Sequence, residues 1–182
     1  KNLAKGLEEY SELDNIPKKE KAIIKINLCD ARPPETGAIT HPSFLDAVLK
    51  YLREQYGNDL DIYVVESDSG RVLADLYVQW FGLSPVIEKW RAKWCNLIKE
   101  ETITKRIHGG YFTEIKIPKI FENSYFITLP KMKTHILTKI SCSLKNQHGC
   151  LPVLIKSKFH PYIDDVIVDE NLAMRPEFCV VD

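Results

Sequence analysis

The sequence predicts a single α/β domain in which a mostly parallel sheet lies between two layers of helices, the three-layer arrangement of Rossmann-like folds. Two observations predict it. Short apolar runs rich in β-branched residues alternate along the chain with longer stretches whose apolar residues recur at helical spacing. In addition, the 182 residues are 45% hydrophobic and 27% charged, which is the ordinary composition of one globular domain with a hydrophobic core.

The first elements of this fold are predicted in the first third of the chain. Residues 3–13 have the spacing of a short amphipathic helix, and we expect residues 1–20 to form an N-terminal helical extension to a domain that covers residues 21–182. The run KAIIKINL (21–28) predicts the first strand. A proline-rich loop separates it from a helix over about 43–56, where apolar side chains recur at helical spacing.

The rest of the chain continues the alternation of strand and helix. Further strands are predicted from the runs DIYVVE (61–66), CNLI (95–98), YFTEIKI (111–117), YFITL (125–129) and FCVV (178–181). Helices are predicted over about 71–81, from near Pro85, and over about 135–146. The run DVIV (165–168) fits either a strand or one end of a helix.

Charge and composition argue against several classes of protein. Twenty-five basic and 25 acidic residues give a net charge of zero, whereas a nucleic-acid-binding surface normally shows a basic excess. No apolar run approaches the roughly 18 residues that span a bilayer, and the polar start of the chain has no signal-peptide core. We therefore expect a cytoplasmic protein with no nucleic-acid or membrane partner. Its five cysteines include no C-x-x-C pair, so we expect reduced thiols and no iron–sulfur motif in this chain.

Three polar segments directly follow predicted strands. They are NLCDARPPETGAITHP (27–42), ESDSGR (66–71) and LPKMKTH (129–135). The carboxyl ends of neighbouring parallel strands meet at one edge of a sheet, which is where open α/β folds bind their ligands. If these strands are parallel neighbours, the three segments share one edge, and the sequence predicts a single site there.

The segment LPKMKTH carries the clearest chemistry. Thr134 is placed to cap the helix predicted from His135, and the N-terminus of a helix favours an anion through its free N–H groups and its dipole. Lys131 and Lys133 add formal positive charge. A small carboxylate or phosphate is the natural ligand for this arrangement, and the alternative is a capped helix with solvated lysines.

A stripe of polar side chains runs along one face of the same predicted helix. Its members are Thr134, Thr138, Ser141 and Lys145. Such a face suits either the wall of a cleft or a close contact between helices. Because Lys133 and Lys145 are 12 positions apart, a continuous helix separates them by about 18 Å. Lys145 and Asn146 are therefore expected at the far end of the cleft wall, unless the helix is broken or this end has another role.

The ends of the first two strands supply further candidates. Thr40 or Ser43 is placed to cap the helix that follows, and His41 beside it can transfer a proton, bind a metal or have only a structural role in the cap. Arg32 can pair with a ligand carboxylate or phosphate, or with a neighbouring acid. Glu66 can act as a general base or a metal ligand. We take His41, Glu66 and His135 as the candidate catalytic residues.

The sequence carries no motif that names a cofactor. Its five histidines never form H-x-H or H-E-x-x-H, so a metal site would need ligands from distant segments, and we assign no metal ligands. The glycine patterns of nucleotide-binding loops and the G-x-S-x-G pattern are absent. The cofactor and the oligomeric state stay open at this point.

The order of several motifs resembles the uncharacterised family called domain of unknown function 362. The motifs are N-L…P-E-T-G-A-I-T-H-P, V-V-E-S, L-P-K-M-K-T-H, L-K-N-Q-H-G, K-x-x-F-H and a terminal V-V-D, of which P-K-x-K-T-H and L-K-N-x-x-G are the most specific. The resemblance covers about residues 21–182. The positions that it matches are Thr40, His41, Pro42, Glu66, Lys131, Lys133, His135, Lys145, Asn146, Gly149 and His160.

The sequence departs from the pattern of this family in two respects. Some members of this family carry a ferredoxin-like cluster domain with C-x-x-C motifs, which this sequence does not contain, so it implies no electron-transfer role here. Members also tend to continue past V-V-D with a glycine-rich segment. We therefore expect the α/β domain to be incomplete at its C-terminus.

Three functions are compatible with these observations. The first is an enzyme acting on a small carboxylated or phosphorylated metabolite, whose anion Lys131 and Lys133 bind. In that case His41 or His135 transfers protons, and Glu66 acts as a base or orients another group. The second is a non-catalytic binding or accessory protein linked to an iron–sulfur or redox system. The third is a metal-binding protein that uses histidines and Glu66.

Overall fold

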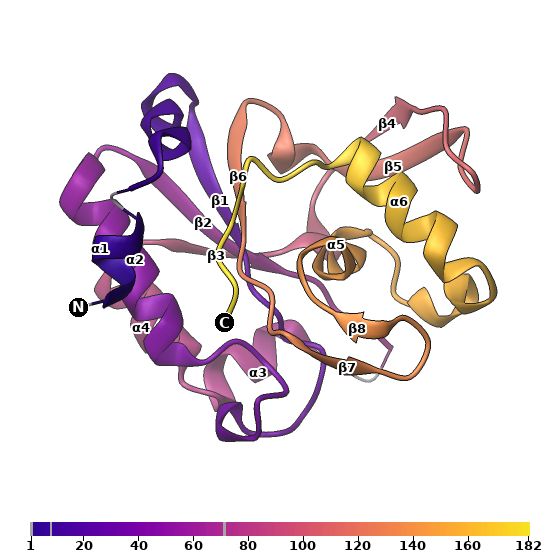
Figure 1. The fold of residues 1–182 in the computed structure, drawn as a ribbon, viewed down its shortest axis with the longest axis horizontal. Coiled ribbons are helices and arrows are strands. Elements are labelled where there is room, and N and C mark those ends of the chain that lie inside the picture. The colour runs from indigo at the N-terminus through magenta and orange to yellow at the C-terminus, as the bar shows by residue number, and fades with distance from the viewer. Residues whose placement is uncertain (1, 8, 71) are drawn as a thin grey trace.

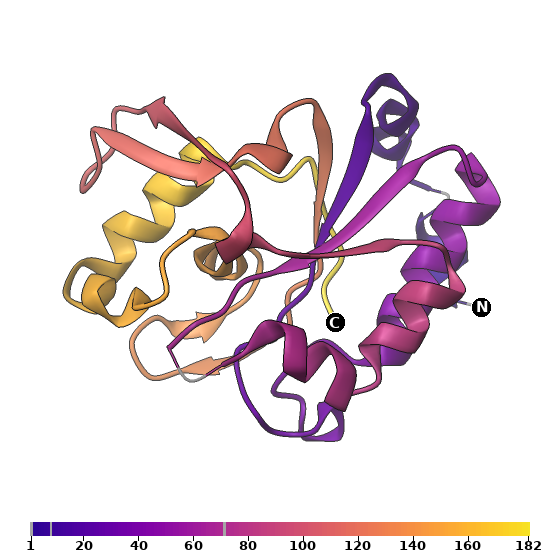
Figure 2. The same cartoon turned by 180° about the vertical axis from the view of Figure 1, so that it is seen from behind.

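The computed structural model describes residues 2–7, 9–70 and 72–182 (Figures 1 and 2). Its centre is a five-stranded, all-parallel sheet with the strand order β3-β2-β1-β6-β9. The strands are β1 (Lys21–Lys25), β2 (Asp61–Glu66), β3 (Lys93–Asn96), β6 (Ser124–Thr128) and β9 (Phe178–Cys179). This parallel sheet, covered by helices, confirms the predicted α/β fold class.

Both faces of the sheet are covered (Figure 1). On one face lie α1 (Asn2–Leu7), α2 (Pro42–Tyr56), α3 (Ala74–Trp80) and α4 (Leu83–Lys89). On the other lie α5 (Ser143–Asn146), α6 (Ile163–Ala173) and an antiparallel hairpin of β4 (Thr102–Arg106) and β5 (Glu114–Pro118). Side chains of β1 alternate between the two cores, so that Ile24 packs on the first face and Ile23 on the second. By the same alternation, Lys25 faces the second side.

Short 3-10 helices fill many of the connections. They are η1 (Ser11–Lys18), η2 (Pro34–Thr36), η3 (Leu97–Lys99), η4 (Lys119–Phe121), η5 (Gln147–Cys150) and η6 (Lys156–Tyr162). The stretch predicted as one helix over 3–13 is divided between α1 and η1, and residue 8 within it lies outside the described residues. Leu7 and Ile16 are buried in the same core as α2, so this N-terminal segment packs against the first helical layer.

The predicted helix over 135–146 is wrong. The chain there forms an antiparallel hairpin of β7 (Lys133–His135) and β8 (Lys139–Ser141), and only then the short helix α5. The physical reason lies in the sequence itself, because β-branched residues occupy every second position from Thr134 to Ile140, a period of two that favours strands. Thr134 therefore does not cap a helix, and the polar stripe does not lie on one helical face.

Three other predicted elements differ in detail from the structure. The run YFTEIKI (111–117) contributes β5, which pairs with β4 in a separate hairpin and not with the parallel sheet. The run DVIV (165–168), which fitted either a strand or a helix end, lies inside α6. The helix predicted over 71–81 corresponds to α3, and residue 71 itself lies outside the described residues. Within the part of the chain that the structure describes, no helix has the length and apolar character to cross a membrane.

The strand order reverses at β1, and this positions the site. The chain runs outwards from β1 to β2 and β3, then returns to place β6 on the other side of β1. The connections that leave the carboxyl ends of β1 and β6 therefore diverge to opposite sides. Such a switch point opens a crevice at the carboxyl edge of a sheet, and ligands of open α/β folds bind there.

Candidate functional site

A cleft of about 490 Å³ lies at this carboxyl edge of the sheet. The first loop after β1, the end of β2, the β7–β8 hairpin, the α5–η5 segment and the start of η6 all contribute side chains to it. Residues that are far apart in the sequence thus surround one space, and most of those that carry charge are basic. Residues of all three polar segments that were predicted to share one edge of the sheet line this cleft.

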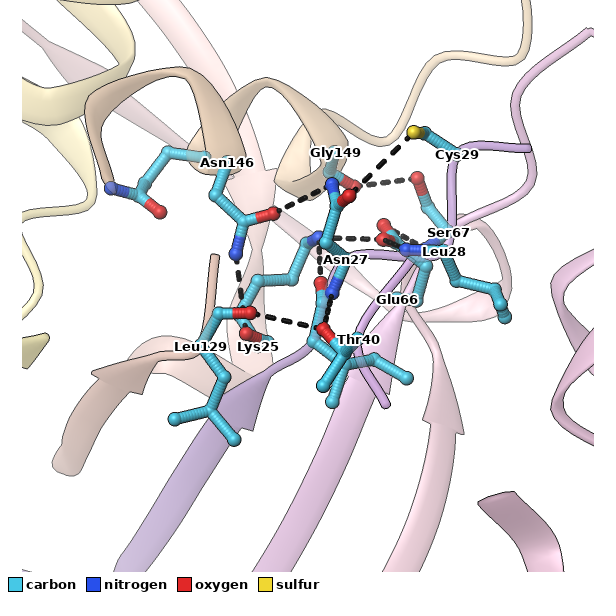
Figure 3. Close-up of polar contacts among 12 residues, drawn as sticks. Lys25, Asn27, Leu28, Cys29, Thr40, Glu66, Ser67, Leu129, Asn146 and Gly149 are labelled. Atoms are coloured by element: carbon cyan, nitrogen blue, oxygen red, sulfur yellow. Dashed lines mark hydrogen bonds and ion pairs between the residues drawn. The ribbon is translucent and has the colours of Figure 1, made fainter. Parts of the chain in front are cut away.

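The floor of the cleft is a buried ion pair between β1 and β2 (Figure 3). Lys25 is fully buried, and its Nζ donates to Glu66 Oε2 at 2.7 Å and to the carbonyl oxygen of Ile26 at 2.6 Å. Glu66 also accepts the backbone N–H groups of Leu28 at 3.0 Å and Ser67 at 2.9 Å. Both carboxylate oxygens of Glu66 thus accept hydrogen bonds, and bonds of this kind are what a buried ion pair needs to be stable.

Gly149 lies directly against this ion pair. A Cβ atom at this position would stand 2.5 Å from Glu66 Oε1 and 2.7 Å from Lys25 Nζ, so only glycine fits. The hydroxyl of Ser67 donates to the carbonyl oxygen of Gly149 at 2.6 Å, which fixes η5 against the end of β2. The requirement for glycine here comes from close approach, not from a helix C-terminus.

Side-chain amides connect Lys133 to the α5–η5 segment, which carries Lys145. Figure 3 shows the central hydrogen bond of this connection, between Asn27 and Asn146. Asn146 donates through Nδ2 to Thr128 Oγ1 at 2.9 Å, and its Oδ1 accepts from Asn27 Nδ2 at 3.1 Å. Asn27 Oδ1 in turn accepts from Lys133 Nζ at 2.6 Å. Lys133 and Lys145 both line the same cleft, so the predicted separation of about 18 Å along a helix does not apply.

The three basic side chains above this floor differ in how they are held. Lys133 donates to Asn27 Oδ1, to Cys29 Sγ at 3.0 Å and to the carbonyl oxygen of Ala38. Lys156 donates to the hydroxyl of Ser67 at 2.8 Å and to two backbone carbonyl oxygens. Lys145 is half-buried, and its Nζ has no hydrogen-bond partner in the described part of the chain.

These three lysines also lack acidic partners. The cleft's two carboxylates are already paired, Glu66 with Lys25 and Asp30 with Arg32 at 2.6 Å. Among the residues that the structure describes, none of the three lysines forms an ion pair. Burial lowers the pKa of Lys156 to about 8 and also lowers the pKa of Lys145. The protein thus keeps three amines together in one cleft, where burial disfavours the positive charge of Lys145 and Lys156.

Three imidazoles complete the cleft. Burial lowers the pKa of both His135 and His160, and the positive charge of Lys145 lowers each further, so both are neutral near pH 7. His135 Nδ1 accepts two backbone N–H groups of its own hairpin at 3.3 Å. His148 lies at 2.7 Å, through its Nδ1, from Oε1 of the buried Glu170.

Comparison with known proteins identifies the family. A family model with the description "Domain of unknown function (DUF362)" matches residues 23–182. The chain belongs to this family. No curated protein matches the sequence. The resemblance inferred from P-K-x-K-T-H and L-K-N-x-x-G is thereby confirmed, and in this DUF362 domain both motifs contribute side chains to the same cleft.

The cleft of the DUF362 domain brings together most of the predicted site residues. They are Arg32, Glu66, Lys133, Thr134, His135, Lys145 and Asn146. Of these, Lys145 lines the cleft with an amine that has no hydrogen-bond or ion-pair partner among the described residues, whereas Arg32 is paired with Asp30.

Three predicted residues lie elsewhere. His41 Nδ1 caps α2 by accepting the N–H of Ser43 at 3.2 Å, and His41 lines a second hollow with Lys131. There Lys131 is paired with Asp182 at 3.0 Å. Thr40 is fully buried, where its Oγ1 accepts the N–H of Asn27 at 2.8 Å and donates to the carbonyl oxygen of Leu129 at 3.1 Å. His41 and Lys131 are thus not brought together with Glu66 and Lys133 in one cleft.

Some residues of the site were missed by the sequence reasoning. Lys25 interrupts an apolar strand at the position where alternation demands a buried side chain, and that pattern could have identified it. Lys156 directly follows the apolar run VLI (153–155) but lies at the start of η6, so no such alternation identifies it. Asn27 and Glu170 gave no comparable sign, because an asparagine after a strand and a glutamate in a helix are ordinary features.

The metal-binding hypothesis gains no support from the geometry of the described residues. Among the described residues, no group of three or more histidine, cysteine, aspartate or glutamate side chains is arranged to hold a metal ion. Burial raises the pKa of Cys150 to about 12, and it also raises the pKa of Cys95, so neither thiol ionises near neutral pH.

Proposed function

We propose that this cleft binds a small anion that carries a carboxylate or phosphate group. One observation carries the proposal: three lysines share a cleft with no carboxylate left to pair with them, and one of the three, Lys145, has no hydrogen bond within the described part of the chain. Grouped ammonium ions repel one another, and burial adds a desolvation cost to each. An anion between the lysines offsets both their mutual repulsion and the cost of desolvation, and it supplies hydrogen-bond acceptors for Lys145.

The hydrogen bonds of the three lysines indicate which role each one has in anion binding. Lys133 and Lys156 are each held by three acceptors, so they contribute mainly positive potential to the cleft. Lys145 has all its hydrogen-bonding capacity available, so it is the direct contact for the anion. The imidazoles of His135 and His160 border the same space and can donate further hydrogen bonds to it.

Replacing Lys145 by methionine is expected to weaken anion binding at least about tenfold, because one charge-assisted hydrogen bond is worth about 1.5–3 kcal/mol. Titration calorimetry at pH 7 measures it, with inorganic phosphate in one arm and malonate in the other to distinguish the two anion classes. Lys116→Met is the matched control, since Lys116 is an exposed lysine on β5 outside the cleft. Lys131→Met tests the second hollow and is expected to leave the affinity within about twofold. Equal affinities in wild type and Lys145→Met would refute the proposal.

Anion affinity is also expected to fall as the pH rises through about 8, the pKa that burial gives Lys156. Lys145 and Lys156 are charged below their lowered pKa values and attract the anion. Above those pKa values they are neutral, so affinity is greatest at lower pH and is lost on the alkaline side. Sulfate is the suitable probe because its own charge is constant in this range. We expect a loss of about tenfold between about pH 7 and about pH 9.5 in calorimetric titrations, and an affinity that stays level would contradict the assignment.

A further inference from the structure

We propose that Lys145 is an amine nucleophile that forms an imine with a small anionic carbonyl compound, a 2-oxo acid, and that His148 moves the protons of this step. The inference rests on the anion-binding cleft proposed above and names the class of ligand that its chemistry suits. It concerns two side chains on one short helical segment, together with Glu170 behind them.

Lys145 differs from the other lysines of the cleft in having a free amine. Lys25, Lys133 and Lys156 all donate to protein oxygens or sulfur, which occupies their ammonium hydrogens. No such bond engages Lys145 Nζ among the described residues. A nucleophilic amine needs an unprotonated nitrogen with an open approach. Burial and the nearby charges of Lys25 and Lys133 lower the pKa of Lys145, which raises its neutral fraction.

His148 is placed on the same side of the segment as Lys145. The α5 and η5 helices are contiguous, and positions three apart lie on one face of such a turn. Both residues line the cleft. His148 is therefore a neighbour of the amine by local geometry as well as by the shape of the cleft.

Glu170 sets which nitrogen of His148 is available. The carboxylate is fully buried and 2.7 Å from His148 Nδ1, and an ionised carboxylate only accepts hydrogen bonds. In the neutral imidazole the proton therefore sits on Nδ1, and Nε2 is the nitrogen that can accept a proton. His148 is only 5% exposed, and its Nε2 is buried and has no hydrogen-bond partner within the described part of the chain. A buried nitrogen left without a partner is costly, and a proton-transfer role toward the cleft accounts for it.

The proposed step balances without an oxidant or a metal. The lone pair of Lys145 Nζ adds to the carbonyl carbon, and His148 Nε2 takes one proton from the nitrogen and passes it to the oxygen, which becomes a hydroxyl. His148 then carries the second proton of the nitrogen to this hydroxyl, which leaves as water while the carbon–nitrogen double bond forms, so that His148 ends as it began. The carboxylate of the 2-oxo acid stays in the positive field of Lys133 and Lys156 throughout.

Reductive trapping tests the inference directly. The chain is incubated with pyruvate, reduced with sodium borohydride and digested, and peptide mass spectrometry locates the carboxyethyl group. We expect this group on Lys145 in the wild type, its loss from this position in Lys145→Arg, and unchanged labelling of Lys145 in the control Lys116→Arg. Labelling confined to exposed lysines, with Lys145 unmodified, would overturn the imine. Phosphate affinity measured on the same sample reports separately on the anion cleft, so the two proposals fail independently.

The role of His148 has its own readout. His148→Gln is expected to slow trapping of pyruvate at Lys145 about tenfold or more, since general acid–base catalysis contributes at least that much. Glu170→Gln removes the anchor of Nδ1, and as the test of a positioning residue it is expected to shift the pH profile of trapping. Trapping at the wild-type rate with the wild-type pH profile in both variants would remove His148 from the step.

Discussion

Replacing Lys25 by methionine is expected to lower the free energy of unfolding by about 3–5 kcal/mol, because the Glu66 carboxylate then stays buried without its cation. Lys25 is fully buried and its Nζ lies 2.7 Å from Glu66 Oε2. Methionine keeps the length of the side chain and removes only the charge and the donors. Urea denaturation followed by circular dichroism measures the loss.

The double variant Lys25→Met with Glu66→Met separates charge from shape. Removing both charges leaves no unpaired ion in the interior, so we expect it to recover a large part of the stability lost in the single variant. Lys21→Met, at the partly exposed start of the same strand, is the matched control and is expected to change stability by less than about 0.5 kcal/mol. A single Lys25→Met variant as stable as the wild type would contradict the assigned role of this pair as the floor of the cleft.

Replacing Asp169 by alanine is expected to cost about 3 kcal/mol or more. Its fully buried carboxylate accepts the backbone N–H groups of Gly110 at 2.9 Å, Tyr111 at 2.9 Å and Phe112 at 2.7 Å. Three donors of the β4–β5 connection thus lose their acceptor at once. A Cβ atom at Gly109 would overlap this carboxylate, which shows how closely the loop wraps around it.

Thermal unfolding monitored by circular dichroism measures this second effect. Asp164→Ala is the control, because Asp164 is an exposed acid in the first turn of the same helix and contributes only through the helix dipole, about 0.3–1 kcal/mol. Equal losses in the two variants would show that the three backbone contacts do not stabilise the fold. Asp169 directly precedes Glu170 in α6. The three hydrogen bonds of Asp169 therefore also hold the part of α6 that positions the Glu170 carboxylate beside His148.

The sequence was sufficient to predict the sheet and the edge at which the cleft lies. β1, β2 and β6 come from apolar β-branched runs whose burial on both faces of a parallel sheet leaves little alternative. Parallel strands then bring the polar segments that follow them to one edge, which is why Glu66 and Lys133 line the same cleft.

Local ambiguity explains the wrong helix over 135–146. Its apolar residues satisfy helical spacing, yet its β-branched residues also alternate with a period of two, and the hairpin satisfies the second pattern. The error mattered for the site, because a helix would hold Lys133 and Lys145 far apart, whereas the hairpin and the turn into α5 bring both to one cleft.

Contacts between residues far apart in the sequence explain why the roles of His41 and His148 were not predicted. His41 lies in the connection between β1 and α2, where its imidazole caps α2 locally and Asp182 accepts its backbone N–H at 2.9 Å. Conversely, the importance of His148 comes from Glu170, 22 residues further along the chain. Pairings of this kind are set by how α6 packs on η5, which a periodicity in the sequence does not encode.

A crystal structure of the chain grown in the presence of inorganic phosphate tests the central claim most directly. We predict density for one phosphate in the cleft at the carboxyl edge of the sheet, within hydrogen-bonding distance of Lys145 Nζ and near the side chains of Lys133 and Lys156. A cleft without phosphate, with the anion instead bound in the hollow of Lys131 or with Lys145 paired to a carboxylate of the protein, would contradict it.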